Sequence, residues 1–444
     1  MVSFDKNQIY IIDGAMGTEI QKRQVESKFF KYEGIDCDGF NDILVLTKPG
    51  LIKDIHGDYI NAGANIIETN TFNANYISAL DYGLSDEAID KINFSAAKIA
   101  KQAAKKSKEE VYVAGVLGPT SKTLSMSPNV TDPSYRDITY HELLNAYKAA
   151  TENLIRGGAD LILIETVFDT LNAKAAIEAV RLVGEDIPIM ISGTIVDMSG
   201  RTLSGQTVEA FWNSVKHARP ISIGLNCALG AKQMDPFLRR LADVSGCAIS
   251  AHPNAGLPNE LGEYDQSPSD MANYIKNWAK SGIVNIIGGC CGSTPEHIKK
   301  IANTVKKFKP KRRITRSFNL DRSMILSGLE VFDSKGKNFI NIGERTNVTG
   351  SSRFKKCIVE KRYDDALNIA RSQILNGAQI IDINMDDGLL DSKSEMINFL
   401  KMLACEPDIA KVPIMLDSSK WDILSEAMRW IQGKGIVNSI SLKD

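Results

Sequence analysis

The chain has 444 residues, a charged fraction of 24% and a formal net charge of −1 at pH 7. This length predicts two or three domains, and the balanced charge argues against binding to nucleic acid or to an acidic membrane surface. No apolar run reaches membrane-spanning length, and the first residues lack a secretory signal pattern. Seven cysteines in so long a chain do not indicate a disulfide framework. We therefore expect a cytoplasmic protein.

From Ile9 onward, short apolar β-branched runs alternate with longer stretches of helical periodicity. Near-continuous apolar strands separated by helices are typical of a parallel sheet buried on both faces. Eight such units predict a complete (β/α)8 TIM barrel. A doubly wound open sheet is the alternative, but no Gly-x-Gly-x-x-Gly turn follows the first strand. The predicted strands are Ile9–Asp13, Asn65–Thr69, Val111–Val116, Asp160–Glu165, Pro188–Ser192, Ile221–Asn226, Ala248–His252 and Val284–Ile287, and the clearest helices are Asp86–Lys106, Tyr140–Arg156 and Leu171–Leu182.

A basic stretch, Lys306–Arg316, separates this barrel from a second region. It lacks interleaved aromatic residues, so a solvated linker is favoured over a nucleic-acid patch. We predict a barrel domain over residues 1–308, a linker over 309–325 and a second domain over 326–444. In the second domain, Gly336–Glu344 is expected to form a hairpin arm that feeds a strand at Asn338–Gly343.

Three more strands and three helices follow, which makes four strands in the second domain. We therefore expect the first half of a second TIM-like barrel, whose open sheet edges are costly. The chain is interpreted as truncated or as one part of a split assembly. The strands are Gln379–Met385, Val412–Asp417 and Gly435–Ile440, and the helices are Tyr363–Asn376, Ser392–Leu403 and Trp421–Gln432.

Three cysteines fall at the rim where barrel enzymes carry their sites. Cys290 and Cys291 follow the eighth strand inside Gly288-Gly289-Cys290-Cys291-Gly292, and Cys227 follows the sixth. Glycines on both sides let the backbone leave strand geometry, so two adjacent thiols can turn the same way. Three thiolates with an open fourth position predict a catalytic zinc site. A substrate thiol entering that position would be deprotonated and become a sulfur nucleophile.

The alternative for these cysteines is a role as small apolar core residues. The flanking glycines argue against it for the pair, since such a residue has no need of them. His252, near a strand end, is interpreted as a hydrogen-bonded core histidine. The cysteines interpreted as ordinary core residues are Cys37, Cys247, Cys357 and Cys405.

Two acids, Asp13 and Glu165, also lie at predicted strand ends. Such a pair could hold an ammonium group, and the exposed amides of the Gly14–Gly17 turn could accept a carboxylate. Together these groups suit an amino-acid thiol. For either acid alone, a helix N-cap or a supporting hydrogen bond is an equal alternative.

These residues resemble the homocysteine S-methyltransferase family. The resemblance implies that Cys227, Cys290 and Cys291 bind zinc and act in catalysis, and that the zinc binds the homocysteine thiolate. It further implies that Asp13, Thr69, Phe72 and Glu165 contact the amino acid. The segments that carry it are Asp13-Gly14-Ala15-Met16-Gly17, Glu68-Thr69-Asn70-Thr71-Phe72, Gly224-Leu225-Asn226-Cys227 and Gly288-Gly289-Cys290-Cys291-Gly292.

The second domain is similar to pterin-binding barrels of the dihydropteroate-synthase type. Those barrels bind the pterin edge through Asp and Asn side chains at strand ends, so Asn347, Asp382, Asp417 and Asn438 are implied to bind 5-methyltetrahydrofolate. The order of the two domains resembles the cobalamin-dependent methionine synthase family, which implies methylcobalamin bound by a module in a missing part or a separate chain. The carrying segments are Gly343–Gly350, Ile381–Asn384, Leu416–Lys420 and Val437–Ser439.

The leading hypothesis is therefore a methyltransferase. A zinc-activated homocysteine thiolate would accept a methyl group from methylcobalamin, recharged from 5-methyltetrahydrofolate, to give methionine. One alternative is a stand-alone homocysteine S-methyltransferase that uses S-methylmethionine or betaine. Another is a non-catalytic zinc- or folate-binding subunit of a split assembly.

Overall fold

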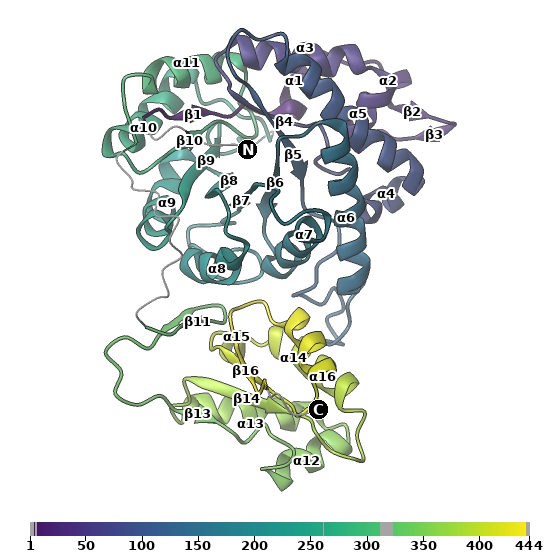
Figure 1. The fold of residues 1–444 in the computed structure, drawn as a ribbon, viewed down its shortest axis with the longest axis vertical. Helices are drawn as coiled ribbons and strands as arrows, with labels where there is room; N and C mark the ends of the chain where they lie inside the picture. Colours follow the sequence, from purple (N-terminus) through teal and green to yellow (C-terminus); the bar gives the residue numbers. More distant parts are fainter. Residues whose placement is uncertain (1–3, 5–6, 261, 311–322, 441–444) are drawn as a thin grey trace.

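In the computed structural model, residues 4, 7–260, 262–310 and 323–440 are described. Figure 1 shows two units along the long axis: a barrel of strands ringed by helices, and a smaller α/β unit beneath it. None of the helices within these ranges is long and apolar enough to cross a membrane.

The first unit is an eight-stranded parallel sheet in the order β1-β10-β9-β8-β7-β6-β5-β4. A parallel bridge between Ile12 and Ile66 joins the two end strands and closes the barrel. All eight predicted strands are present, so the prediction of a TIM barrel is confirmed. They are β1 (Tyr10–Ile11), β4 (Ile66–Glu68), β5 (Tyr112–Leu117), β6 (Leu161–Val167), β7 (Ile189–Gly193), β8 (Ser222–Gly230), β9 (Ala248–Asn254) and β10 (Ile286–Ile287).

Helices surround the barrel and bury their apolar faces against it, as Figure 1 shows. The three helices predicted most clearly correspond to α5, α6 and α7, each within two residues at either end. A small hairpin of β2 (Lys31–Tyr32) and β3 (Ile35–Asp36) projects to one side. The helices of this unit are α1 (Met16–Lys22), α2 (Leu44–Thr47), α3 (Pro49–Asn61), α4 (Tyr76–Ala79), α5 (Asp86–Ala104), α6 (Tyr140–Gly157), α7 (Thr170–Val183), α8 (Val208–Val215), α9 (Ala231–Val244), α10 (Pro268–Ser281) and α11 (Pro295–Val305), with short 3-10 turns η1 (Ser27–Phe30), η2 (Asn41–Ile43), η3 (Leu80–Tyr82) and η4 (Lys216–Ala218).

The barrel interior changes from apolar to polar along its strands. Every second residue of a strand points inward. Ile66 on β4 and Leu163 on β6 belong to an inner apolar cluster. Two residues further on, Glu68 and Glu165 therefore point into the barrel at its C-terminal end. This parity explains how acids from non-adjacent strands come to share one chamber.

The second unit contains a four-stranded parallel sheet in the order β13-β14-β15-β16, as expected for part of a second barrel. The strand predicted at Asn338–Gly343 shortens to two residues, while the other three strands and the three helices lie where they were predicted. The elements are β13 (Ile342–Gly343), α12 (Ser352–Val359), α13 (Tyr363–Leu375), β14 (Ile380–Asn384), α14 (Ser392–Ala404), α15 (Pro407–Ala410), β15 (Ile414–Asp417), α16 (Trp421–Ala427), η5 (Met428–Trp430) and β16 (Ile436–Asn438).

The predicted hairpin lies earlier in the chain than expected. It is formed by β11 (Ile325–Ser327) and β12 (Val331–Asp333), which pair antiparallel. The turn at Gly336, which suggested the later hairpin, instead closes after β12 through a bond from Lys337 N–H to Ser334 O. The sequence therefore predicted the hairpin turn at Gly336, whereas the hairpin in the structure lies between β11 and β12. Most of the predicted 309–325 linker, including the end of the basic stretch, lies outside the described residues.

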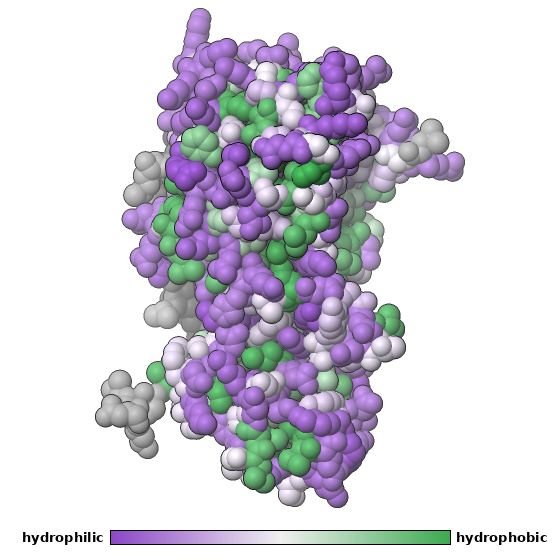
Figure 2. Space-filling model, turned by 90° about the vertical axis from the view of Figure 1, so that its right-hand side faces the viewer, coloured by the Kyte–Doolittle hydropathy of each residue, from purple (hydrophilic) through white to green (hydrophobic). Residues whose placement is uncertain are grey.

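Polar contacts join the two units. Lys174 on α7 donates to the carbonyl oxygens of Ile431 (3.0 Å) and Gly433 (2.6 Å). Gln206 Nε2 donates to Gly328 O at 2.8 Å, at the hairpin between β11 and β12. Figure 2 shows a surface that is mostly hydrophilic, with apolar patches over both units, one of them at the lower end of the second unit.

Candidate functional site

The three predicted cysteine ligands converge at the C-terminal end of the barrel. Cys227, Cys290 and Cys291 place their sulfur atoms within 4.8 Å of one another. The Sγ atoms of Cys227 and Cys291 are 3.8 Å apart. Sulfurs bound at about 2.3 Å to a tetrahedral zinc ion are about 3.8 Å from each other. The spacing and the soft donor set therefore fit zinc with one position left for another ligand.

Cys227 reaches this site through a local break in strand geometry. Asn226 occupies the inward-facing position of β8, where regular alternation would turn Cys227 outward. Instead, Cys227 and Ala228 adopt left-handed backbone conformations, with φ of 61° and 55°. The register between β8 and β9 shifts over the same residues. A bulge of this kind re-aims a side chain next to a functional site.

Asn226 holds the backbone at this bulge and at a neighbouring one. Its Oδ1 accepts from the Thr166 N–H (3.1 Å) and from Ser192 Oγ (2.7 Å), and its Nδ2 donates to Thr166 Oγ1 (2.8 Å). Thr166 itself has a left-handed φ of 55° on β6. One buried amide thus hydrogen-bonds to the strained Thr166, which follows Glu165, and directly precedes the strained Cys227.

The glycines around Cys290 and Cys291 allow close packing. A Cβ on Gly289 would lie 2.3 Å from Ser293 Oγ, and one on Gly288 would lie 2.4 Å from a methyl carbon of Ile12. Gly292 has φ of +78°, and its Cβ would lie 2.2 Å from Tyr264 Cβ. The sequence suggested that these glycines free the thiols to turn; the structure adds that they let β1, Ser293 and Tyr264 approach.

Hydrogen bonds within the thiol cluster favour one thiolate, at Cys291. The pKa of Cys291 is lowered because Cys227 and Cys290 hydrogen-bond to its sulfur, with Tyr264 contributing as well. Burial and the nearby Cys291 raise the pKa of Tyr264 to about 12, so its hydroxyl stays a donor at neutral pH. A single thiolate supported by these donors is a suitable starting state for binding a soft cation.

A buried acidic chamber lies beside the thiols. Asp13 Oδ2 accepts the Glu68 N–H at 3.0 Å, while Asp13 Oδ1 is buried without a partner among the described residues. Burial, followed by the neighbouring Glu165 carboxylate, raises the pKa of Glu68. Burial also raises the pKa of Glu165 to about 8. The chamber therefore favours a bound cation, which would stabilise the ionised carboxylates.

His252 also faces this chamber. It pairs in register with Asn226 and is 2% exposed. Its Nδ1 is 3.8 Å from Glu68 Oε1, and its Nε2 has no partner among the described residues. His252 is therefore a buried core residue, as predicted, but neither ring nitrogen makes the predicted short hydrogen bond in the described structure.

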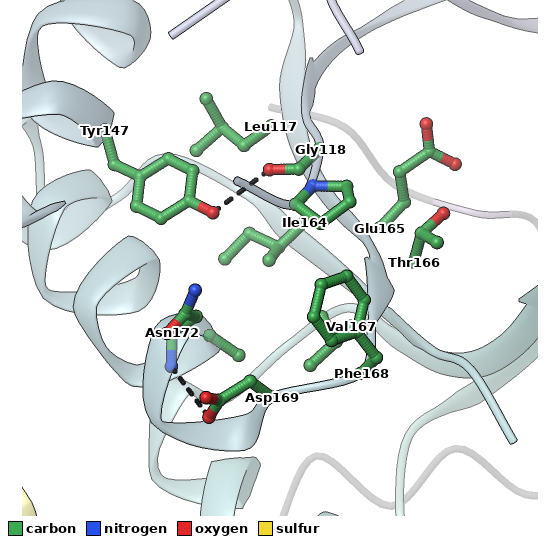
Figure 3. Close-up of a pocket in the computed structure, with 12 residues that line it drawn as sticks. Leu117, Gly118, Tyr147, Ile164, Glu165, Thr166, Val167, Phe168, Asp169 and Asn172 are labelled. Atoms are coloured by element: carbon green, nitrogen blue, oxygen red, sulfur yellow. Dashed lines mark hydrogen bonds between the residues drawn. The ribbon is translucent and has the colours of Figure 1, made fainter. Parts of the chain in front are cut away.

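A small pocket adjoins the outer side of β6 behind Glu165. Figure 3 shows the carboxylate of Glu165 pointing away from the pocket residues Tyr147 and Asn172. Tyr147 donates to Gly118 O at 3.0 Å. Asp169 caps α7 by accepting from the Leu171 N–H at 2.9 Å. These bonds hold the ends of β5 and β6 in place, so the pocket supports the chamber from outside.

The remaining predicted substrate residues, Thr69 and Phe72, lie at the same rim of the barrel. The Thr69 hydroxyl accepts the Val116 N–H at 2.9 Å and lies 2.7 Å from Thr71 Oγ1. Its hydrogen bonds therefore tie β4 to β5. Phe72 is 38% exposed in the following loop. In the predicted carboxylate-binding turn, the Ala15 N–H donates to Ser293 Oγ at 3.2 Å.

The second unit brings three of its four predicted pterin residues together. Asn347 Nδ2 lies 3.1 Å from Asp382 Oδ2 and 3.4 Å from Asp417 Oδ2. Asn384, which was not predicted, donates to Asp417 Oδ2 at 3.0 Å. Burial raises the pKa of Asp382 to about 6, and its Oδ1 has no partner in the described ranges. Asn438 is exposed on edge strand β16, in register with Asp417.

Sequence reasoning missed Glu68, Asn226, His252 and Tyr264 as contributors to the first site. Glu68 and Asn226 lie within the sequence segments that carry the family resemblance. Both occupy inward-facing positions in the alternation of their strands, and this alternation was the signal that could have identified them. For His252 the same parity applies along β9. Tyr264 lies in a loop, where the sequence carries no such periodic signal.

The fold and site together define a TIM-barrel protein with a trithiol site at its C-terminal rim and a second α/β unit. Residues 10–305 match the family model for homocysteine S-methyltransferase. Because that match spans more than half of the chain, the protein belongs to the homocysteine S-methyltransferase family. Residues 343–444 match the family model for pterin binding enzymes.

Two solved structures of the Escherichia coli homocysteine methyltransferase MmuM share the barrel fold. The oxidized form is 20% identical and the metallated form 21% identical, each with a TM-score of 0.55. Each match covers 67% of this chain and 97% of the other. At this identity the likeness concerns the fold.

Proposed function

We propose that the protein takes part in methionine synthesis of the cobalamin-dependent type. Homocysteine would be the methyl acceptor, 5-methyltetrahydrofolate the methyl source and methylcobalamin the carrier between them. Membership of the homocysteine S-methyltransferase family supports methyl transfer to homocysteine, and the pterin-binding match supports a folate-type substrate. The observation that carries the proposal is the convergence of three thiols beside a buried acidic chamber.

Zinc is the metal that this donor set fits, with Cys227, Cys290 and Cys291 as its ligands. When bound, zinc would supply the Lewis acidity that removes a thiol proton near neutral pH. The protein's own residues would orient the acceptor: the chamber acids face its ammonium group, and Asn226 keeps Cys227 turned inward. Asp13 and Glu165 are buried, so little water reaches their charged contacts.

The second unit would bind the methyl donor. Asn347, Asp382, Asn384 and Asp417 form one hydrogen-bonded group at the C-terminal ends of β13–β15 and in the adjoining loop. Amide and carboxylate groups offer the donors and acceptors that a pterin edge requires. The unpartnered Asp382 Oδ1 leaves one acceptor free for such a ligand. Asn438 would join this group at the edge of the sheet.

The direct test supplies the full chain with zinc, homocysteine and methylcobalamin, and follows methionine by mass spectrometry. We expect methionine to form with the wild type and to fall to background with Cys290→Ala, because the thiol cluster loses one of its three sulfur ligands. Cys247→Ala, which alters a buried cysteine outside the cluster, is the matched control.

Two outcomes would replace this proposal. Methionine formed from S-methylmethionine or betaine but not from methylcobalamin would indicate a stand-alone methyltransferase. Tight zinc and folate binding without any methyl transfer would indicate a binding subunit. For zinc itself, stoichiometric metal retained by a Cys227/Cys290/Cys291 triple alanine variant would contradict the ligand assignment.

A further inference from the structure

The loop that follows β4, residues 69–75, presents one exposed aromatic side chain on a buried base. Phe72 is 38% exposed, and it comes shortly after Glu68 of the acidic chamber. A loop of this kind can hold a single side chain in a fixed place at the rim of the barrel. Apart from the half-buried Asn73, the other residues of the loop are buried: Thr69, Asn70, Thr71, Ala74 and Asn75.

One attachment joins this loop to β5. Thr71 Oγ1 donates to Val116 O at 2.9 Å. The carbonyl group of Phe72 lies against Gly118, where an added Cβ would be only 2.1 Å from the Phe72 oxygen atom. The end of β5 therefore supports the backbone directly at Phe72.

A second attachment joins the loop to η2 through Asp42. Asp42 Oδ1 accepts the Asn73 N–H at 3.0 Å, and the Ala74 N–H also hydrogen-bonds to this carboxylate. Asn70 Nδ2 donates to Asn41 O at 3.0 Å. Asp42 thus binds the two backbone amides that directly follow Phe72.

Asp42 is suited to hold this backbone in one conformation. It is 1% exposed, and the neighbouring Phe40 and Ile43 are fully buried, so η2 itself is firmly packed. Burial raises the pKa of Asp42 to about 7, while the N–H groups of Asn73 and Ala74 act to lower it. A buried carboxylate is costly unless it is hydrogen-bonded, and bonds to an ionised acceptor are stronger than bonds to a neutral one. The carboxylate and the loop amides therefore stabilise each other.

An exposed phenyl ring at this rim matches the chemistry of the proposed methyl acceptor. Homocysteine has methylene groups between its thiol and its α-carbon, and an aromatic ring that covers them removes apolar surface from water. The contact depends on where the ring stands, because a displaced ring leaves the methylene groups in water. The residue that fixes the backbone next to Phe72 therefore controls the contact.

We propose that Asp42 is a positioning residue for homocysteine binding, which holds the loop so that Phe72 packs against the bound substrate. The inference rests on the proposed function, since it takes homocysteine as the ligand of the first unit. Asp42 does not touch the substrate itself; it acts through Phe72.

A double-mutant cycle tests this route. The dissociation constant of homocysteine is measured by calorimetry on the zinc-loaded full chain, for the wild type, Asp42→Ala, Phe72→Ala and the double variant. We expect each single substitution to weaken binding about tenfold, because the contact of the ring with the methylene groups is lost. The double variant should also lose about tenfold rather than about a hundredfold, since residues that act through one contact are not additive.

Hydrogen exchange gives a readout that depends on neither zinc nor substrate. In the metal-free full chain, the amides of Asn73 and Ala74 should exchange about tenfold faster or more in Asp42→Ala, because their acceptor is gone. Asp160→Ala is the matched control. Asp160 Oδ2 also accepts a backbone N–H, that of Val113 at 2.8 Å, but just before β6, at the opposite end of the barrel. This control should change neither the exchange of the loop amides nor the affinity for homocysteine.

Asp42→Asn separates positioning from general stability. The substitution is near-isosteric and keeps one oxygen acceptor. The affinity of this variant for homocysteine should therefore lie between those of Asp42→Ala and the wild type. If Asp42→Ala does not fold, Asp42→Asn takes its place in the cycle with Phe72→Ala.

Three results would overturn the inference. Unchanged homocysteine affinity in Asp42→Ala, with a loss of stability alone, would make Asp42 a purely structural residue. A loss of about a hundredfold in the double variant would mean that Asp42 acts independently of Phe72. Unchanged amide exchange would mean that Asp42 does not hold the loop. A wild-type protein that binds no homocysteine would instead contradict the proposed function itself, while the exchange measurement still tests the hold of Asp42 on the loop.

Discussion

At the scale of single residues, the site depends on buried polar side chains that hold strained backbone. Cys227 faces the other two thiols because its φ is positive, and the preceding Asn226 is anchored by hydrogen bonds to Thr166 and Ser192. A non-glycine residue in the left-handed region costs about 1–2 kcal/mol. The strain persists because neighbouring hydrogen bonds fix it, as is common at functional sites.

Asn226→Ala should therefore disrupt the metal site. The variant loses three side-chain hydrogen bonds, two to Thr166 and one to Ser192. We expect a loss of about 2–4 kcal/mol in the free energy of unfolding and weaker zinc retention against a chelator. Asn93→Ala removes a buried asparagine bonded to Ala74 O and Ile89 O, and serves as control. Equal zinc retention by the two variants would contradict the role assigned to Asn226.

At the scale of elements, much of the fold could be predicted because strands and helices leave periodic signals. All eight barrel strands and the four strands of the second sheet were found from apolar runs. The hairpin at Ile325–Asp333 was missed, since its strands have three residues each and the Gly336 turn gave a stronger signal. Short strands carry too few residues to establish a period.

The candidate site was predictable only in part. The three cysteines were found because they sit in motifs at predicted strand ends. The proximity of Glu68 and His252 was missed because it depends on which strands face each other across the barrel, which a one-dimensional pattern does not contain. Tyr264 was missed because a loop positions it, and loops have no period.

The loop that carries Tyr264 can be tested through two glycines. Gly292 and Gly262 both have positive φ, at +78° and +77°, but a Cβ on Gly292 would meet Tyr264 at 2.2 Å while Gly262 faces open space. Gly262→Ala should cost about 1 kcal/mol and leave zinc binding intact. Gly292→Ala should cost several kcal/mol in unfolding and displace Tyr264 from Cys291. Chemical denaturation and zinc titration compare them, and identical behaviour would show that the Tyr264 contact is unimportant.

At the scale of the whole molecule, the two units share a partly polar interface. Lys174 is a buried cationic residue at this interface. Burial lowers the pKa of Lys174 to about 7, and its Nζ donates to two carbonyl oxygens of the second unit. Arg429 also reaches across to Glu178 at 3.2 Å. Interfaces of this kind hold domains in one arrangement at a cost in desolvation.

This lysine predicts a pH-dependent stability. Its folded-state pKa is depressed from an ordinary value of about 10.4, so between about pH 7 and pH 10 the unfolded chain binds more protons. The free energy of unfolding should therefore rise with pH across this window, by an amount on the order of a few kcal/mol. Lys174→Met should lose this rise, and Lys148→Met, at a partly exposed lysine on α6, should keep it. Denaturant titrations at pH 7, 8 and 9 measure the difference, and parallel pH profiles for all three proteins would refute the prediction.

The second unit gives the whole molecule its proposed methyl source, and Asp382 tests that assignment. Its carboxyl is buried and its pKa is raised to about 6, chiefly by burial. Binding of 5-methyltetrahydrofolate through the ionised carboxylate should therefore be strong above pH 6 and weaken as pH falls below it. Asp382→Asn should weaken binding about ten- to a hundredfold at pH 7.5, because an amide replaces a charged acceptor. Asp365→Asn, at an exposed residue paired with Arg362 on the outer surface, should bind like the wild type. Fluorescence titration of the full chain measures both, and pH-independent binding that Asp382→Asn leaves unchanged would place the folate elsewhere.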